Sequence, residues 1–187
     1  MPGDVFGFLV NTLFTLFGIA LVIRAWMYAI RLHPFNPYSQ AILRATNWLA
    51  QPLRRVIPQS SRVDWPSLVA CWLTALVFLS LSWLLGAGAA PSLGMLPMLA
   101  LAALLTALKW TFNVILWVTL IQAILSWVNP MAPIMAVLHT LTAPLLDPIR
   151  RVLPNTGGLD FSPLVLLIIA QVAMIFLGQA VYSVFTL

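Results

Sequence analysis

Two pairs of arginines occupy matching places in the sequence, Arg54-Arg55 and Arg150-Arg151. A guanidinium binds carboxylates and phosphates through a planar fork of N–H donors, which lysine does not offer. An aspartate follows the first arginine of each pair by ten residues, Asp64 and Asp160. We expect each aspartate to favour the start of the helix that follows it and to pair with the arginines of its own segment. The pairs are therefore candidate sites for anionic lipid headgroups or for an acidic partner.

Residues suited to catalysis or to cofactor binding are scarce. The chain has one cysteine, two histidines and no glutamate. It contains no Cys/His cluster with zinc spacing, no Gly-rich phosphate loop and no Gly-x-Ser-x-Gly motif. His33 and His139 fall in loops, whereas a haem ligand has to face a cofactor cavity. We predict a protein that is not an enzyme and that binds no metal and no cofactor.

The amino-acid composition indicates that most of the chain lies in a membrane and not in water. Hydrophobic residues make up 62% of the 187 residues and charged residues only 7%, against about 45–50% and about 25% in soluble domains. A soluble globular fold is excluded. The net charge of +5 is an arginine excess, but arginine pairs without a wider basic patch do not predict nucleic-acid binding.

Four segments are long and apolar enough to cross a bilayer. We place them at Val5–Ile30, Pro66–Leu85, Leu108–Val128 and Pro163–Tyr182. Residues 95–107 either extend the third span or form a short interfacial piece, and Lys109 is expected to snorkel from the outer end of that span. Polar residues within the spans either line a pathway or join helices by hydrogen bonds; they are Asn11, Asn113, Gln122, Gln171 and Gln179.

The arginines predict the orientation. Seven of the nine basic residues lie between the first and second spans or between the third and fourth. Lys and Arg in short loops mark the cytoplasmic side. Both arginine-bearing loops are therefore expected in the cytoplasm and both termini outside.

An internal repeat relates the two halves of the chain. At an offset of 96 residues, residues 34–69 align with residues 130–165 without a gap, and 12 of the 36 pairs are identical. We predict an all-α membrane protein with a first repeat at 1–90 and a second at 91–187. Each repeat consists of a helix, a cytoplasmic amphipathic segment and a helix, and the two are parallel about an axis along the membrane normal.

The two cytoplasmic segments are predicted to be amphipathic helices that prolines kink or divide. In the first, the apolar face comprises Tyr38, Ala41, Ile42, Ala45, Trp48, Leu49 and Leu53, and the polar face Gln40, Arg44, Asn47, Gln51, Arg54 and Arg55. In the second, the apolar face comprises Val137, Leu138, Leu141, Leu145, Ile149 and Val152, opposite His139, Thr140, Asp147, Arg150 and Arg151. The dividing prolines are Pro52, Pro144 and Pro148.

The second segment resembles the signature of the YggT family. The resemblance rests on residues 148–154, read PIRRVLP, and on residues 157–163, read GGLDFSP; residues 52–58, read PLRRVIP, form a looser first copy. Its structural motif residues are Pro52, Pro58, Asp64, Pro148, Pro154, Gly157, Gly158 and Asp160. The resemblance implies a small bacterial membrane protein, with relatives associated with cytochrome assembly, division or nucleoid organisation and osmotic tolerance.

Two kinds of function follow from these patterns. The first is a non-enzymatic scaffold or assembly factor of the bacterial inner membrane. It would act through its arginine and proline loops on anionic lipids or other membrane proteins, with a homo-oligomer also compatible. The second is a small-solute or ion transporter or channel. The absence of acidic residues from the spans favours the scaffold.

Overall fold

Four long apolar helices dominate the structure, a computed structural model that describes residues 2–32, 37–58, 60, 63–153 and 160–186. They are α1 (Pro2–Ala29), α3 (Trp65–Ala87), α4 (Leu96–Val128) and α6 (Ser162–Thr186). Each is long and apolar enough to cross a bilayer, and the predicted count of four spans is confirmed. Every regular element in the described ranges is helical, since the short η1 (Leu93–Met95) is a 3-10 turn.

Local sequence explains where the helices begin and end. Asp64 is the N-cap of α3, and Pro66 occupies its first turn, where a missing N–H costs no hydrogen bond. The helix ends where Gly88 adopts a φ of 69° and donates its N–H to the Leu84 carbonyl. Glycine reaches this left-handed conformation without steric cost.

The third span differs from its predicted bounds. The helix α4 runs without a break from Leu96 to Val128, so residues 96–107 extend the span and the expected start near Leu108 is wrong. The run LPMLALAALLTA contains mostly good helix formers after its proline, and nothing in it interrupts the helix. Lys109 therefore lies well inside α4 rather than at its end.

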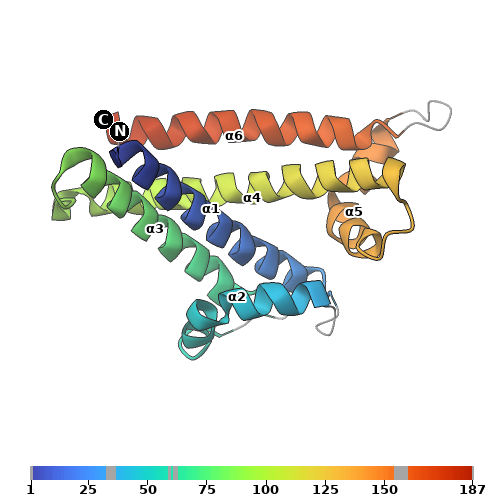
Figure 1. Ribbon diagram of the computed structural model, residues 1–187, viewed down its shortest axis with the longest axis horizontal. Coiled ribbons are helices and arrows are strands. Elements are labelled where there is room, and N and C mark those ends of the chain that lie inside the picture. Colours follow the sequence, from blue (N-terminus) through green and yellow to red (C-terminus); the bar gives the residue numbers. More distant parts are fainter. Residues whose placement is uncertain (1, 33–36, 59, 61–62, 154–159, 187) are drawn as a thin grey trace.

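The arrangement of the helices reproduces the tandem repeat. In Figure 1, α1 lies antiparallel to α3 and α4 antiparallel to α6, and both chain termini lie at the same end of the bundle. The shorter helices α2 (Pro37–Arg54) and α5 (Met135–Val152) lie at the other end, here called the loop end. Two parallel helix–helix–helix repeats are therefore present, as predicted.

The two repeats meet where α1 and α3 pack against α4. A Cβ added to Gly18 of α1 would come within 2.1 Å of the Trp110 ring of α4. Trp110 is buried in the main hydrophobic cluster together with Leu21 of α1 and Ala75 of α3. Only glycine allows the helices to approach this closely, because any side chain would overlap the indole.

The amphipathic helices pack differently in the two repeats. The helix α5 buries Val137, Leu138 and Leu141 of its predicted apolar face, although Val152 at its end is exposed. In contrast, α2 buries Ser39, Thr46 and Ala50, while Tyr38 and Trp48 are exposed. The predicted orientation of α2 is therefore only partly right.

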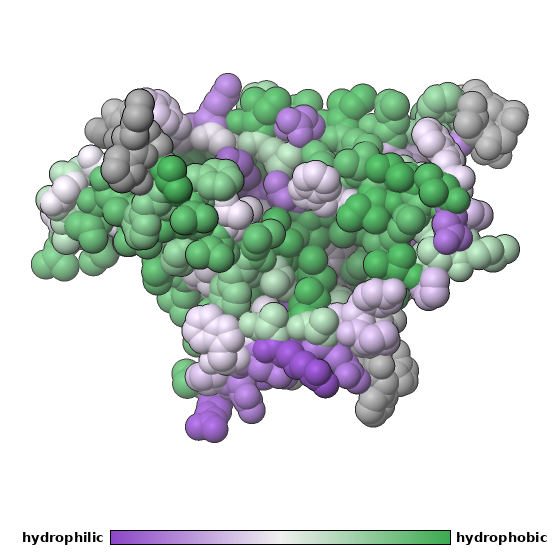
Figure 2. Space-filling view, viewed as in Figure 1, coloured by the Kyte–Doolittle hydropathy of each residue, from purple (hydrophilic) through white to green (hydrophobic). Residues whose placement is uncertain are grey.

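The prolines do not divide these helices. Pro52 lies in the last turn of α2, and Pro144 and Pro148 lie within α5, yet both helices are continuous. Pro52 and Pro148 lie close to the C-terminal ends of their helices, whereas Pro144 lies in the middle of α5, where a proline removes one backbone hydrogen bond. Figure 2 shows mostly apolar side chains on the visible face and polar side chains gathered along its lower edge, below α2.

Candidate anion-binding sites at the loop end

Asp64 lies at the centre of the first candidate site. Its side chain is fully buried, and its Oδ2 lies 3.4 Å from Nη2 of Arg54, as the sequence motif predicts. The Ser67 hydroxyl donates a second hydrogen bond to the same oxygen at 2.6 Å. The carboxylate thus joins the end of α2 to the start of α3.

A second cation faces the same carboxylate. Arg24 of α1 is 2% exposed, and its Nε lies 3.7 Å from Oδ2 of Asp64. Its Nη1 donates to the Thr46 hydroxyl at 2.8 Å and to the Asn47 side-chain oxygen at 2.9 Å. A buried charge requires such partners, because its unpaired transfer from water is costly. This requirement turns Thr46 and Asn47 of α2 inward and leaves Tyr38 and Trp48 outside.

The equivalent site in the second repeat is open to solvent. Asp160 accepts hydrogen bonds from Nε of Arg150 at 2.9 Å and from the Ser162 backbone N–H at 2.9 Å, and Arg150 also contacts Asp147 at 3.3 Å. About two-fifths of the side-chain surface of Arg150 and of Asp160 remains exposed. The position that matches Arg24 holds Leu120, so this site has no counterpart of the buried Arg24 guanidinium.

These contacts change the acidity of Asp160. Partial burial acts to raise its pKa, but hydrogen bonds from Ser162 and the neighbouring Arg150 guanidinium outweigh burial and lower the pKa of this carboxyl. Asp160 is therefore ionised at neutral pH and remains so into the acid range.

The two arginines of each pair have different surroundings. Arg54 and Arg150 face the aspartate of their own segment, whereas Arg55 and Arg151 are exposed and make no ion pair or hydrogen bond with another described residue. The pairs stand at the C-terminal ends of α2 and α5, which lie well apart in Figure 1. The arginine pairs form two separate basic sites and not one cluster of four guanidiniums.

The remaining motif residues divide into two groups. Pro52 and Pro148 lie within helices and Pro58 follows α2, all three exposed. Pro154, Gly157, Gly158 and His33 lie outside the described residues.

Gln122, predicted to line a pathway or to join helices, joins helices. Its side-chain oxygen accepts a hydrogen bond from Thr142 of α5, and its amide nitrogen lies 3.0 Å from Nδ1 of His139. Thr142 is the repeat equivalent of Thr46. Each repeat therefore uses the same buried threonine to attach its short helix, with arginine as the partner in the first repeat and glutamine in the second.

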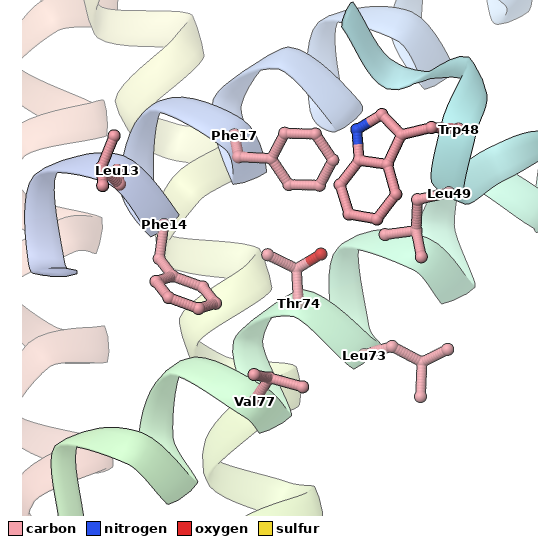
Figure 3. A pocket seen from close by; sticks show the side chains of 8 residues that line it. All are labelled: Leu13, Phe14, Phe17, Trp48, Leu49, Leu73, Thr74 and Val77. Atoms are coloured by element: carbon pink, nitrogen blue, oxygen red, sulfur yellow. The ribbon is translucent and has the colours of Figure 1, made fainter.

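An apolar cavity of about 540 Å³ lies beside α2. In Figure 3 the Phe17 ring of α1 and the Trp48 ring of α2 lie side by side at the edge of the cavity, and Phe14 and Val77 also line it. The two rings stack with their centroids 5.2 Å apart, and the Thr74 hydroxyl turns back to the Ala70 carbonyl. The exposed apolar side of α2 and this cavity offer a surface suited to lipid acyl chains.

Sequence reasoning missed Arg24 as a site residue. The residue ends the uncharged part of the first span, yet the apolar run WMYAI after it places it inside the helix. An ionisable residue inside a span indicates a partner of opposite charge. The lone carboxylate at the start of the second span, Asp64, would have been the natural choice for that partner.

Known proteins resemble this chain along most of its length. The CCB3/YggT family model matches the chain twice, at residues 4–85 and 101–181. The chain is 38% identical to "Uncharacterized protein YggT" of Escherichia coli K12, over 88% of this chain and 85% of the relative. It is 38% identical to "Uncharacterized protein in proC 3'region" of Vibrio alginolyticus, over 93% and 94% of the two chains.

A third relative, an uncharacterized protein of Pseudomonas aeruginosa, is 35% identical over 84% of this chain and 80% of its own length. No solved structure matches the chain. The two matched segments coincide with the helix triplets α1–α3 and α4–α6. The chain is thus a multi-pass membrane protein with two tandem repeats, and it belongs to the CCB3/YggT family.

Proposed function

We propose that this protein is a non-enzymatic scaffold or assembly factor of the bacterial inner membrane. It holds acidic or phosphate groups of membrane-protein or lipid partners at its cytoplasmic face. The observation that carries the proposal is that the two arginines of each pair have different contacts. Arg54 and Arg150 fix the loop to an aspartate, and Arg55 and Arg151 beside them present exposed guanidiniums on a framework that is already ordered.

The orientation in this proposal places the loop end in the cytoplasm. Seven of the nine basic residues belong to the two loops at this end, and retained Lys and Arg mark the cytoplasmic side. The exposed apolar side of α2 would then lie in the inner leaflet, with Trp48 at the interface as in an aromatic belt. Cell division, cytochrome assembly and osmotic tolerance are the processes in which such a scaffold is expected to act.

Arginine-to-lysine changes test whether the exposed guanidiniums recognise a partner. The test variant is R55K/R151K, and R44K, an exposed arginine of α2 outside the pairs, is the matched control. Membrane proteins that copurify with the wild type in mild detergent should be retained by R44K and lost by R55K/R151K, because the planar fork disappears while the charge stays. Membrane abundance should be equal for all three.

The competing outcome is equally clear. If R55K/R151K retains every copurifying protein, the arginines only anchor the short helices to anionic headgroups, which depends on charge alone. The exposed arginines would then not be a partner-binding site, and the scaffold proposal would be contradicted.

Transport is the second candidate. Within the described residues, each membrane-crossing helix is continuous, whereas many transporters bind substrate at interrupted helices. Solute flux into liposomes that contain the protein, above that of empty liposomes and abolished by N113L, would support transport over the scaffold.

A further inference from the structure

A polar groove runs along the outside of the α4–α6 hairpin. It has a volume of about 630 Å³, and Lys109 and Asn113 of α4 face Gln171, Gln179 and Tyr182 of α6 across it. The groove follows α6 for three turns, from Gln171 to Tyr182. Asn113 contacts Met174 at 3.8 Å, which joins the two walls.

The lysine lies several helical turns from the ends of α4 and α6. Its ammonium is beside Gly178, where an added Cβ would be 3.7 Å from Nζ. Gly178 is about 12 Å along α6 from the C-terminal end of that helix, at 1.5 Å per residue. Lys109 lies about 20 Å from the start of α4 by the same measure.

Among the residues that the structure describes, none supplies a counter-charge for this lysine. Lys109 makes no ion pair or hydrogen bond with another described residue, and the four aspartates are Asp4, Asp64, Asp147 and Asp160. Three of them belong to the loop end, and Asp4 lies in the first turn of α1. A cation in the membrane is costly unless it is paired, so this groove is suited to an anionic group of another molecule.

We propose that this groove binds a transmembrane helix of another membrane protein, one that carries an aspartate or glutamate at the depth of Lys109. The amide side chains along the groove match the polar groups of a helix, which transmembrane helices use for association. An acyl chain offers no hydrogen-bonding group to Asn113, Gln171 or Gln179. Gly178 lets a helix backbone approach closely, as small residues do at such interfaces.

Two other occupants fit less well. A phospholipid keeps its charged group at the headgroup layer, above the ammonium. A second copy of this chain in the same orientation has no acidic residue at that depth. The inference rests on the proposed function only for the class of partner, and it uses none of the arginines at the loop end.

The test uses synthetic Leu/Ala transmembrane peptides of about 23 residues. One peptide carries a glutamate about eight residues from its outer end, at the depth of Lys109, and two controls carry glutamine or leucine there. Energy transfer between labelled full-length protein and peptide is measured in phosphatidylcholine vesicles. We expect the glutamate peptide to associate on the order of tenfold more tightly than the leucine peptide, with glutamine between them.

Variants of the protein assign that preference to the groove. K109L should remove the advantage of glutamate over glutamine, and K109E should prefer a peptide with lysine at the same place. The variant K109L/L104K keeps one lysine on α4 but moves it to an exposed position outside the groove, and it should also lose the preference. Lys109 and Leu104 are both exposed, so these changes leave the packed core intact.

Three results would overturn the inference. Equal association of the glutamate and glutamine peptides would mean that the lysine does not recognise an anion. Displacement of the peptide by phosphatidylglycerol would assign the groove to an anionic lipid. Energy transfer between two labelled copies that depends on Lys109 would assign it to self-association. R55K/R151K should behave as wild type here, so failure of this test and failure of the scaffold proposal are distinguishable.

Discussion

The two arginine–aspartate motifs have the same spacing but different environments. In the first repeat, Asp64 is buried and shared by Arg54 and Arg24; in the second, Asp160 is exposed and served by Arg150 and Ser162. The first repeat has an arginine at position 24, and the matching position 120 of the second repeat has a leucine. This single difference accounts for much of the contrast between the two sites. The same motif thus joins three helices through a buried carboxylate in the first repeat, and in the second it joins the end of α5 to the start of α6 through an exposed carboxylate.

Loss of the Asp64 carboxylate should have the largest effect. D64N leaves the buried Arg24 guanidinium without a counter-charge, and breaking a buried pair in this way costs about 3–5 kcal/mol. Thermal unfolding in detergent, followed by tryptophan fluorescence, should show a large fall in the melting temperature. The double variant R24L/D64N should recover much of the loss, and equal stability of D64N and wild type would contradict a buried pair.

Removal of Arg24 alone should cost less than D64N. In R24L, Asp64 keeps Arg54 and Ser67, while the side-chain oxygens of Thr46 and Asn47 lose their donor, at about 1–3 kcal/mol for buried polar groups. The same unfolding measurement ranks R24L between wild type and D64N. If R24L proves the more damaging change, Arg24 and not Asp64 is the centre of the network.

The matched threonines test whether both short helices are attached in the same way. T142V leaves the Gln122 oxygen without the Thr142 hydroxyl, and T46V removes one acceptor of Arg24; each should cost about 1 kcal/mol. Protease sensitivity of α5 should increase in T142V only, and that of α2 in T46V only. Increased cleavage of both helices in either variant would show that the repeats do not loosen independently.

The smallest effect is expected at Asp160, and it depends on pH. Because the fold lowers its pKa below the usual value of about 3.9, Asp160 contributes stability at neutral pH that is lost as the pH falls through the lowered pKa. D160N should therefore be less stable than wild type by under about 1 kcal/mol near pH 7, given the exposure of the pair. The two melting curves should converge in strong acid; a gap that widens there would reverse the assignment.

The sequence predicted the repeat, the four spans and the pairing of each aspartate with its own arginines, because apolar length and identical motifs report these features directly. It did not predict that α2 turns Ser39, Thr46 and Ala50 toward the protein. A helical wheel assigns the apolar face of a helix to the protein interior, whereas in a membrane the apolar face can instead contact lipid. The depth of Lys109 was missed for a related reason. Residues 96–107 are apolar enough to span, but the sequence left open whether they continue the helix, and only the structure shows α4 unbroken from Leu96 to Val128.

The length of α4 has a mechanical consequence. Its 33 residues measure about 50 Å at 1.5 Å per residue, against a hydrocarbon thickness of about 30 Å. Even a tilt of about 40°, the upper end of what membrane helices show, leaves part of the helix in the headgroup layers. The apolar length of α4 therefore exceeds the hydrocarbon thickness of a typical bilayer, and this hydrophobic mismatch is smaller in a thicker membrane.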